Sequence, residues 1–276
     1  MKYNIYIGSQ KSHELIIKVL EYSLKINSRY DVNVFPIYQN FCSKHKPPVC
    51  KKNLPGTSFS FQRFIIPEIM SFKGLGLYLD SDMIVFEDIK DLFDTAINDN
   101  QIYLPSNYKR TGHTSVMLIN SSKCNWKIND IIKLLDEEHL SYKELMQEVK
   151  ICTKIGTFNK NWNCLDVYNN DTKLLHFTNM SKQPWLSAKN HLAHHWFKYF
   201  FKCIDEGIIS MDMISSAINN NYVRPSVLYQ IDNNILNPLD IEQKVLLEMD
   251  YDFTKFCINN NWNNLEGNYT NHSLYK

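Results

Sequence analysis

Two aspartates, Asp80 and Asp82, stand at the end of an apolar run, where their types and spacing are suited to holding a metal ion. Residues 74–79 predict a buried central strand, and residues two apart in extended backbone project to one side. The two carboxylates would therefore converge and repel each other, whereas a divalent cation would turn this repulsion into coordination. The alternative is a chance pair, because an Asp at a strand end often caps the following turn, as we expect of Asp88.

A histidine follows a second predicted strand, at residues 173–175. His176 would lie at the same sheet edge as the aspartates, which is where open α/β sheets bind ligands. Alone, a histidine at a strand end is more often a hydrogen-bonding residue than a metal ligand. Two carboxylates and one imidazole suit manganese better than calcium or a metal that prefers thiolates. The sequence thus predicts a site for Mn²⁺, with Mg²⁺ as the alternative, at Asp80, Asp82 and His176.

The elements that position these residues alternate between strand and helix. Strands are predicted at residues 4–7, 31–35, 74–79, 115–119 and 173–175. Helices are predicted at residues 16–24, 59–70, 128–135, 192–206, 211–219 and 241–249. This order predicts an α/β, Rossmann-like fold with a mixed, mostly parallel sheet and helices on both faces. We expect a main domain at residues 1–190 and a helical C-terminal extension, packed on it, at 191–276.

The composition of the 276 residues argues against a nucleic-acid coat or a membrane-embedded chain. Lys and Arg number 30 and Asp and Glu 29, so the formal charge is +1, and the mean hydropathy is -0.36. With no signal peptide or membrane span visible and seven scattered cysteines, we expect a cytoplasmic protein with reduced thiols. Cys42, His45 and Cys50 offer three zinc ligands but no fourth lies nearby, so we expect a plain loop there.

The motifs together resemble those of the retaining family 8 glycosyltransferases, the group that includes glycogenin and has the glycosyltransferase-A fold. The resemblance spans about residues 3 to 230 and follows the order of the family's motifs. Five segments carry the resemblance: the Arg63-bearing segment at 57–69, the aspartate pair within 79–83, a core strand at 115–120, the Trp-Asn pair at 162–163, and a closing motif at 176–185 that begins with His-Phe and ends with Pro-Trp. The resemblance implies that residues 1–190 form a nucleotide-sugar-binding catalytic domain.

The resemblance also implies a UDP-sugar donor, with a metal joining its diphosphate to Asp80, Asp82 and His176. Asp80 would also reach the ribose, and the guanidinium of Arg63 would support the ribose or a phosphate. Further donor contacts are implied for Ile7, Gly8, Ser9, Ser81, Lys182 and Gln183. Lys182 or Gln183 would stabilise the charge that builds on the diphosphate as the glycosidic bond breaks. The implied reaction is retaining transfer of a hexose, with glucose as the first candidate, to a hydroxyl of a glycan or protein, and a homodimer stays open.

The sequence departs from the family's pattern in several places, two of which concern the donor site. Residues 113–115 are His-Thr-Ser where the family usually has Asn-Ser-Gly, and one extra residue in the closing motif places Gln183 directly before Pro184. A UDP-sugar-binding protein without transfer chemistry is therefore a rival interpretation. A nucleotidyltransferase also uses paired aspartates and a metal, but it would need a glycine-rich loop, and residues 8–12 contain a single glycine.

Overall fold

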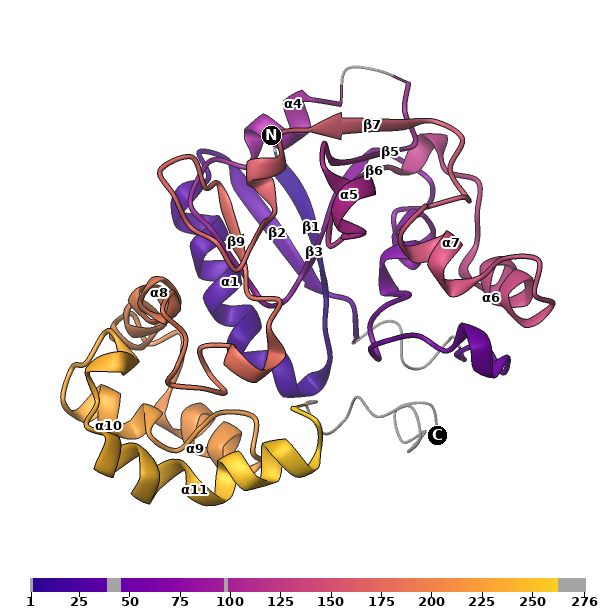
Figure 1. Cartoon of the computed structure of the whole chain (residues 1–276). Helices are drawn as coiled ribbons and strands as arrows, with labels where there is room; N and C mark the ends of the chain where they lie inside the picture. The colour runs from indigo at the N-terminus through magenta and orange to yellow at the C-terminus, as the bar shows by residue number, and fades with distance from the viewer. Residues whose placement is uncertain (1, 39–45, 97–98, 263–276) are drawn as a thin grey trace.

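The centre of the molecule is a six-stranded sheet with the order β2-β1-β3-β6-β5-β7 (Figure 1). The computed structural model describes residues 2–38, 46–96 and 99–262. The strands of this sheet are β1 (Lys2–Gly8), β2 (Asp31–Pro36), β3 (Leu75–Asp80), β5 (Ile102–Pro105), β6 (Val116–Asn120) and β7 (Ile155–Phe158). Strand β6 is antiparallel to both of its neighbours, whereas the other strands share one direction. The predicted mixed, mostly parallel sheet is therefore confirmed.

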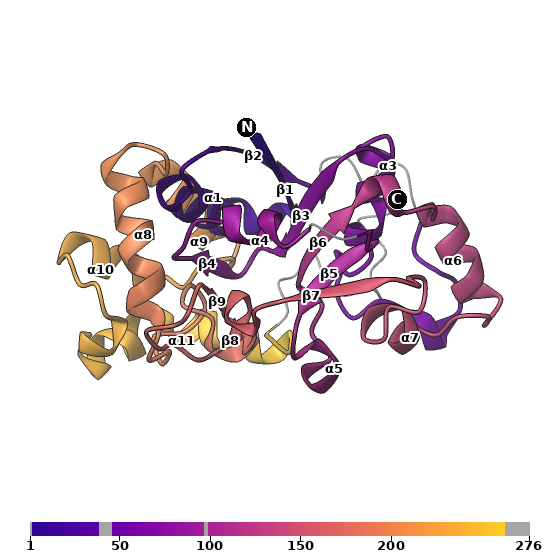
Figure 2. The same cartoon turned by 90° about the horizontal axis from the view of Figure 1, so that it is seen from above.

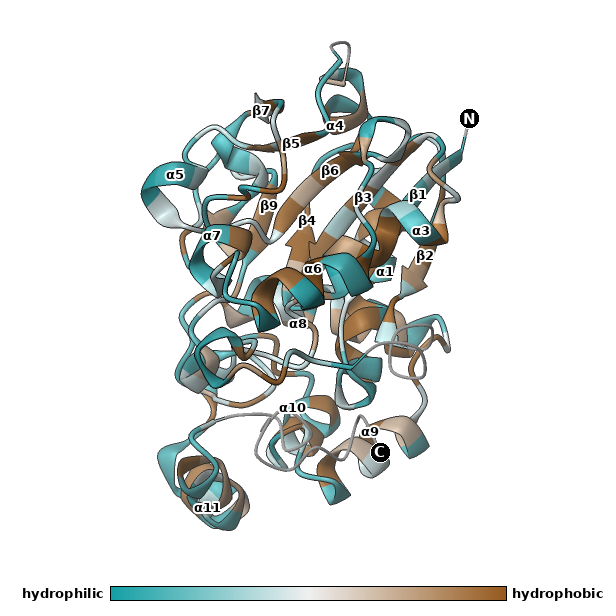
Figure 3. Cartoon of the chain, turned by 90° about the vertical axis from the view of Figure 1, so that its right-hand side faces the viewer, coloured by the Kyte–Doolittle hydropathy of each residue, from teal (hydrophilic) through white to brown (hydrophobic). Residues whose placement is uncertain are grey.

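Helices cover both faces of this sheet because alternate side chains along each strand point to opposite sides. One apolar face, which includes Ile5 and Leu77, packs against α1 (Glu14–Asn27) and α4 (Lys90–Asp94). The other face packs against α3 (Ile66–Ile69), α6 (Ile128–Asp136) and α7 (Tyr142–Met146). Figure 2 shows α1 and α4 on one side of the sheet and α6 and α7 on the other. Figure 3 shows that apolar residues gather in the strands, including β5 and β6.

A second, three-stranded sheet places His176 differently from the prediction. Strand β9 (Leu174–His176) lies between β4 (Met83–Val85) and β8 (Cys164–Leu165), outside the six-stranded sheet. Strand β4 begins three residues after β3 ends and pairs antiparallel with β9, with Met83 opposite His176. The histidine still reaches the aspartates, because β4 carries the chain directly from Asp82 to this pairing.

The C-terminal helices share one apolar core with α1. They are α8 (Ala193–Asp205), α9 (Met211–Asn219), α10 (Val227–Asp232) and α11 (Gln243–Asn259). Helix α8 ends before Gly207, which has a φ of 69°, a conformation that favours glycine. Side chains of α8, α9 and α11 pack with Leu15, Ile16 and Trp185 in a single cluster. These helices therefore pack on both α1 and the segment that carries Trp185.

Some predicted elements differ from the structure. Residues 59–70 form a 3₁₀ turn, η3 (Gln62–Ile65), followed by the four-residue α3, and Pro67 lies in the first turn of α3, where its missing N–H costs no hydrogen bond. Strands β5 and β7, helix α10 and the short helix α5 (Tyr108–Thr111) were not predicted. The remaining 3₁₀ turns are η1 (Lys11–His13), η2 (Lys51–Asn53), η4 (Ser121–Lys123), η5 (Lys160–Trp162), η6 (Met180–Lys182) and η7 (Pro238–Asp240).

Two sequence-based expectations concern residues outside the described ranges. Cys42 and His45 of the candidate zinc loop lie there, and so do residues 263–276 of the expected C-terminal extension. Within the described ranges, no helix combines the length and apolar character needed to cross a membrane.

Candidate active site

A cavity of about 330 Å³ lies beside the carboxyl end of β3. Its walls come from segments far apart in the chain: the turn after β1, residues 56–60, the ends of β3 and β9, residues 112–115, helix α7 and the closing motif near Trp185. The ends of parallel strands leave such a crevice because the chain must turn away toward a helix on one face or the other. The topology thus places five of the ten predicted site residues around this cavity: Arg63, Asp80, Asp82, His176 and Gln183.

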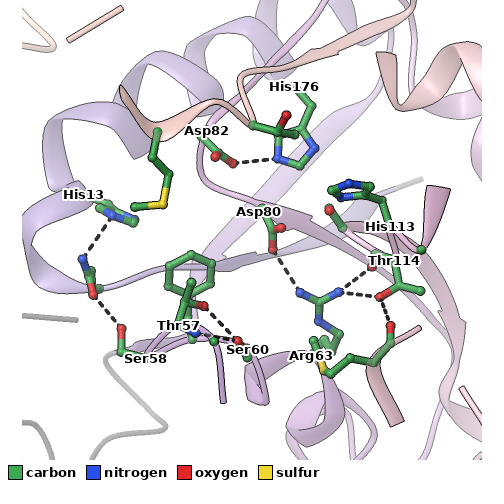
Figure 4. Close-up of a pocket in the computed structure, with 18 of the residues that line it drawn as sticks. His13, Thr57, Ser58, Ser60, Arg63, Asp80, Asp82, His113, Thr114 and His176 are labelled. Carbon is green, nitrogen blue, oxygen red and sulfur yellow. Dashed lines mark hydrogen bonds and ion pairs between the residues drawn. The ribbon is translucent and has the colours of Figure 1, made fainter. Parts of the chain in front are cut away.

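Asp80, Asp82 and His176 meet on one wall of this cavity (Figure 4). Each offers one ligand atom, and these three atoms lie within 4.8 Å of one another. Asp80 ends β3, Asp82 precedes β4 and His176 ends β9, so two different sheets supply the three side chains. The predicted convergence of these residues is confirmed.

Asp82 and His176 form a buried ion pair. Oδ1 of Asp82 lies 3.1 Å from Nε2 of His176, and their side chains are 19% and 4% exposed. Burial lowers the pKa of His176, but the adjacent charge of Asp82 outweighs this effect and the net pKa lies above its ordinary value. Burial likewise raises the pKa of Asp82, yet the charge of His176 brings its net value below the ordinary one. Each group therefore favours the charged form of the other.

Two amide side chains orient this pair from behind. Nδ1 of His176 lies 3.1 Å from Oδ1 of Asn163, so Nδ1 donates to this oxygen and Nε2 is directed at Asp82. Gln183 donates from Nε2 to Oδ2 of Asp82 at 2.9 Å and to the carbonyl of Phe177 at 3.0 Å. Both amides hold the ligand atoms in place without lying between them.

Asp80 is held by a buried tyrosine and a buried arginine. Oη of Tyr78 donates to Oδ1 of Asp80 at 2.5 Å, and Nη2 of Arg63 lies 3.3 Å from the same oxygen. Arg63 also donates from Nη1 to the carbonyl of Thr114 at 2.6 Å and to its Oγ1 at 2.9 Å. The fork of Arg63, which the resemblance assigns to a ribose or phosphate, is thus occupied by Asp80 and Thr114.

The donor set fits a divalent metal ion. Oδ1 of Asp82 is buried and no donor reaches it with hydrogen-bond geometry, even though Nε2 of His176 is close. A buried carboxylate oxygen without a donor is costly, and a cation bound between it and the imidazole nitrogen would satisfy both. Two carboxylates and one imidazole, which would lose its Nε2 proton on binding a metal, form a mixed oxygen and nitrogen set of the kind that Mn²⁺ accepts. Asp80, Asp82 and His176 are therefore the residues that would hold such an ion.

The predicted contacts after β1 lie behind the cavity wall. Ile7, Gly8, Ser9 and Ser81 are not among the residues that line it. Ile7 belongs to the apolar core, and a Cβ at Gly8 would lie 2.0 Å from Oη of Tyr78. The glycine therefore makes room for the side chain of Tyr78.

Ser9 and Ser81 bind other protein groups. The side-chain amide of Gln62 accepts from the N–H of Ser9 at 2.9 Å and donates to its carbonyl at 2.8 Å. Oγ of Ser81 lies 2.7 Å from Nδ1 of His13. Both contacts fix backbone beside the site rather than a ligand in it.

Lys182 does not take the predicted position in the cavity. It is exposed and absent from the lining, because the extra residue of the closing motif lets Gln183 occupy the wall instead. Both amide hydrogens of Gln183 are used by Asp82 and Phe177, so only its Oε1 is left for a ligand. An amide oxygen accepts hydrogen bonds and does not stabilise a phosphate, so the side chain of Gln183 has no donor left for a diphosphate in this arrangement, and the role implied for Lys182 stays a prediction.

Two histidines line the cavity without having been predicted as site residues. His13 is fully buried, and this burial lowers its pKa to about 4 against the opposing charge of Asp82, so His13 is neutral at pH 7. Burial, followed by the charge of His176, also lowers the pKa of His113. The His-Thr-Ser departure marked His113 in the sequence, whereas no motif singled out His13. Only the fold shows that His13 lies beside Ser81.

Comparison with known proteins supports the fold. No protein-family model matches the chain. Protein CDI of Arabidopsis thaliana is 29% identical over 93 residues, which are 33% of this chain and 36% of that protein, so the match spans about a third of the relative's length. Among solved structures, the galactosyltransferase LgtC in complex with donor and acceptor sugar analogues aligns with a TM-score of 0.53 and 12% identity, over 72% of this chain and 95% of that one.

A second solved structure aligns equally well. The glycosyltransferase GlyE of Streptococcus pneumoniae has a TM-score of 0.53 and 21% identity, over 75% of this chain and 63% of that one. At such low identity these similarities establish the architecture and not the activity. The chain thus has the glycosyltransferase-A fold, as predicted, with a possible metal site at the place where the motifs converge.

Proposed function

We propose that this protein is a family 8-like, metal-dependent glycosyltransferase that moves a hexose from a UDP-sugar to a hydroxyl acceptor with retention at the anomeric carbon. The observation that carries the proposal is the convergence of Asp80, Asp82 and His176 within 4.8 Å, on the wall of a cavity in a glycosyltransferase-A fold. When bound, a divalent ion would neutralise the diphosphate and stabilise it as a leaving group. Manganese is the first candidate because of the mixed ligand set.

The residues of this chain hold that site in a fixed shape. Asn163 and Gln183 orient His176 and Asp82, while Tyr78 and Arg63 orient Asp80. These hydrogen bonds hold the four side chains in one arrangement, so little reorganisation is needed when charge develops on the leaving group. The proposed role of these four residues is therefore to keep the ligand atoms converged.

For a retaining transfer, the acidic residues of the cavity favour attack from the leaving-group face over a covalent intermediate. Asp80 and Asp82 are the acidic side chains among the described residues that line the cavity, and both belong to the proposed metal site. No further carboxylate of the described lining is left to act as an enzymic nucleophile. The acceptor hydroxyl would then attack from the side on which the diphosphate departs and pass its proton to a phosphate oxygen.

A second candidate is a protein that binds UDP-sugars without transferring them. The observation that favours it is the position of Lys182 outside the cavity, combined with the engaged amide of Gln183. Among the described lining residues, Arg63 is the one with a permanent positive charge, and Asp80 already pairs with it. Stabilisation of the departing diphosphate would then depend on the metal alone, without help from a cationic side chain of the described lining.

UDP release from a panel of UDP-sugars, measured with and without Mn²⁺, tests the proposal. We expect release that requires Mn²⁺ and that falls at least about 100-fold in Asp82→Asn, because a preorganised electrostatic group is lost. Asp171→Asn is the matched control, since Asp171 is exposed and does not line the cavity. Full turnover in Asp82→Asn would refute the metal-dependent mechanism. Calorimetric saturation with UDP-glucose and Mn²⁺ without any UDP release would favour the binding protein.

A further inference from the structure

A cluster of buried polar side chains lies among the C-terminal helices, outside the cavity lining. Arg224, Ser226 and Gln230 are 0% exposed and Asp250 is 8% exposed. Burying a guanidinium is costly unless its donors are used, and breaking such a pair on one side is strongly destabilising. A cluster of this kind therefore fixes the positions of the segments that it joins.

Arg224 binds groups from three parts of the chain. Its guanidinium donates to Oγ of Ser226 and to Oε1 of Gln230, and its Nη1 lies 4.0 Å from Oδ2 of Asp250 in α11. Its Nε donates to the carbonyl of Pro184 at 3.4 Å. Burial lowers the pKa of Arg224 to about 10, with Asp250 acting in the opposite direction, so the guanidinium stays charged at neutral pH.

The same residue holds the closing motif through its backbone. The N–H of Arg224 donates to the carbonyl of Trp185 at 2.9 Å. The carbonyls of Pro184 and Trp185 thus both accept hydrogen bonds from Arg224. Trp185 also lines the cavity. This places an anchor of the C-terminal helices directly behind the wall of the site.

The anchored segment begins one residue after Gln183. That glutamine donates to Oδ2 of Asp82, so a shift of the Pro184 carbonyl would move the amide that orients the carboxylate. The physical connection runs from Asp250 through Arg224 to Pro184, then through one peptide bond to Gln183, and across a hydrogen bond to Asp82. Every contact in this chain is buried or nearly so, which leaves little freedom for one group to move alone.

We propose that Arg224 is a positioning residue for the metal site, acting through Gln183 on Asp82, and that the C-terminal helices are for this reason part of the site. The inference rests on the proposed function, because it assumes that Asp82 binds a metal. Its contribution is orientation, since Arg224 touches neither the ligand atoms nor the cavity.

Mn²⁺ affinity, followed by the electron paramagnetic resonance signal of free Mn²⁺, tests this without any substrate. We expect Arg224→Met to weaken Mn²⁺ binding by about 10-fold, at the lower end of the effect of residues that orient metal ligands. Arg224→Met leaves the Asp250 carboxylate without its counter-charge, so the double variant Arg224→Met with Asp250→Leu removes both charges and should recover part of the lost stability; the N–H and Oγ of Ser226, which donate to Asp250, lose their acceptor in it. We expect its Mn²⁺ affinity to stay weak. A purely structural role for Arg224 predicts that the affinity returns together with the stability.

Two further variants keep the test decisive if the methionine variants fold poorly. Arg224→Lys keeps a charge beside Asp250 but lacks the fork that reaches Pro184 and Gln230 together, so we expect it to lose affinity as well. Gln183→Ala should weaken Mn²⁺ binding about 10-fold, and adding Arg224→Lys to it should weaken binding no further, because the two residues act in series. The exposed Arg110→Met is the control.

The possible results separate the two proposals. Two results would overturn the role of Arg224 and leave the metal site intact. One is wild-type Mn²⁺ affinity in a folded Arg224→Met, Asp250→Leu variant. The other is additive losses of affinity when Gln183→Ala and Arg224→Lys are combined. A wild-type protein that binds no Mn²⁺ would overturn the metal site and this inference with it.

Discussion

Replacing Arg63 by methionine tests whether Asp80 depends on a buried cation. The Arg63 and Asp80 side chains are 5% and 14% exposed, and the arginine also makes two hydrogen bonds to Thr114 and one to Tyr78 at 3.2 Å. Removing one partner of a buried pair costs about 3–5 kcal/mol because the other charge is left uncompensated. Tyr78 still donates to Asp80 and water reaches the carboxylate, so we expect the lower end, about 3 kcal/mol.

Urea unfolding in the presence of a chelator measures this cost free of metal effects. A double-mutant cycle with Asp80→Asn isolates the pair, and we expect a coupling energy of about 1–2 kcal/mol because the two groups share a network with Tyr78. Arg29→Met is the control, since the side chain of Arg29 is 84% exposed in its pair with Asp88. If Arg63→Met stays within about 0.5 kcal/mol of wild type, as surface substitutions do, the proposed dependence of Asp80 on Arg63 is wrong.

Three further predictions concern residues around the site. Gly8→Ala should destabilise the fold by about 1–3 kcal/mol in urea, because the new Cβ would lie 2.0 Å from Oη of Tyr78; an unchanged midpoint would contradict this. Asn163→Ala should weaken Mn²⁺ binding about 10-fold in calorimetry, whereas Asn163→Asp, which keeps an acceptor for His176, should weaken it less. Glu144 has its pKa lowered to about 2 by its lysine partner and its capping serine, so its stabilising contribution is present above its ordinary pKa and is lost as the pH falls toward 2. The melting-temperature deficit of Glu144→Gln should therefore shrink between pH 6 and pH 3, and a constant deficit would argue against this role.

The residues of the proposed metal site could be found from the sequence because their signals are local. A carboxylate pair two residues apart at the end of an apolar strand carries a cost that the sequence itself displays. His176 also ends an apolar segment, so both motifs could be assigned to strand ends. The helices at residues 193–205 and 211–219 followed from apolar periodicity and from the glycine after the first of them.

Other features depended on contacts between distant segments. The short strands β5 and β7 are recognised by their pairing with each other and not by a sequence pattern of their own. Strand β9 belongs to the second sheet because it pairs with β4, a contact that the sequence does not display. The role of Gly8 was set by Tyr78, 70 positions later in the chain, and that of Ser81 by His13.

The sequence alone determined which residue types gather at the proposed site, since the order and spacing of Asp80, Asp82 and His176 already predicted a shared ligand. The tertiary structure decided which side chains contact these residues. Lys182 lies outside the cavity lining, Gln183 donates to Asp82, and Arg224 donates to the carbonyl of Pro184 in the closing motif. The physical reason is that periodicity and strand ends depend on residues close together in the sequence. A buried hydrogen bond between distant segments depends on the positions that the fold gives to both of them.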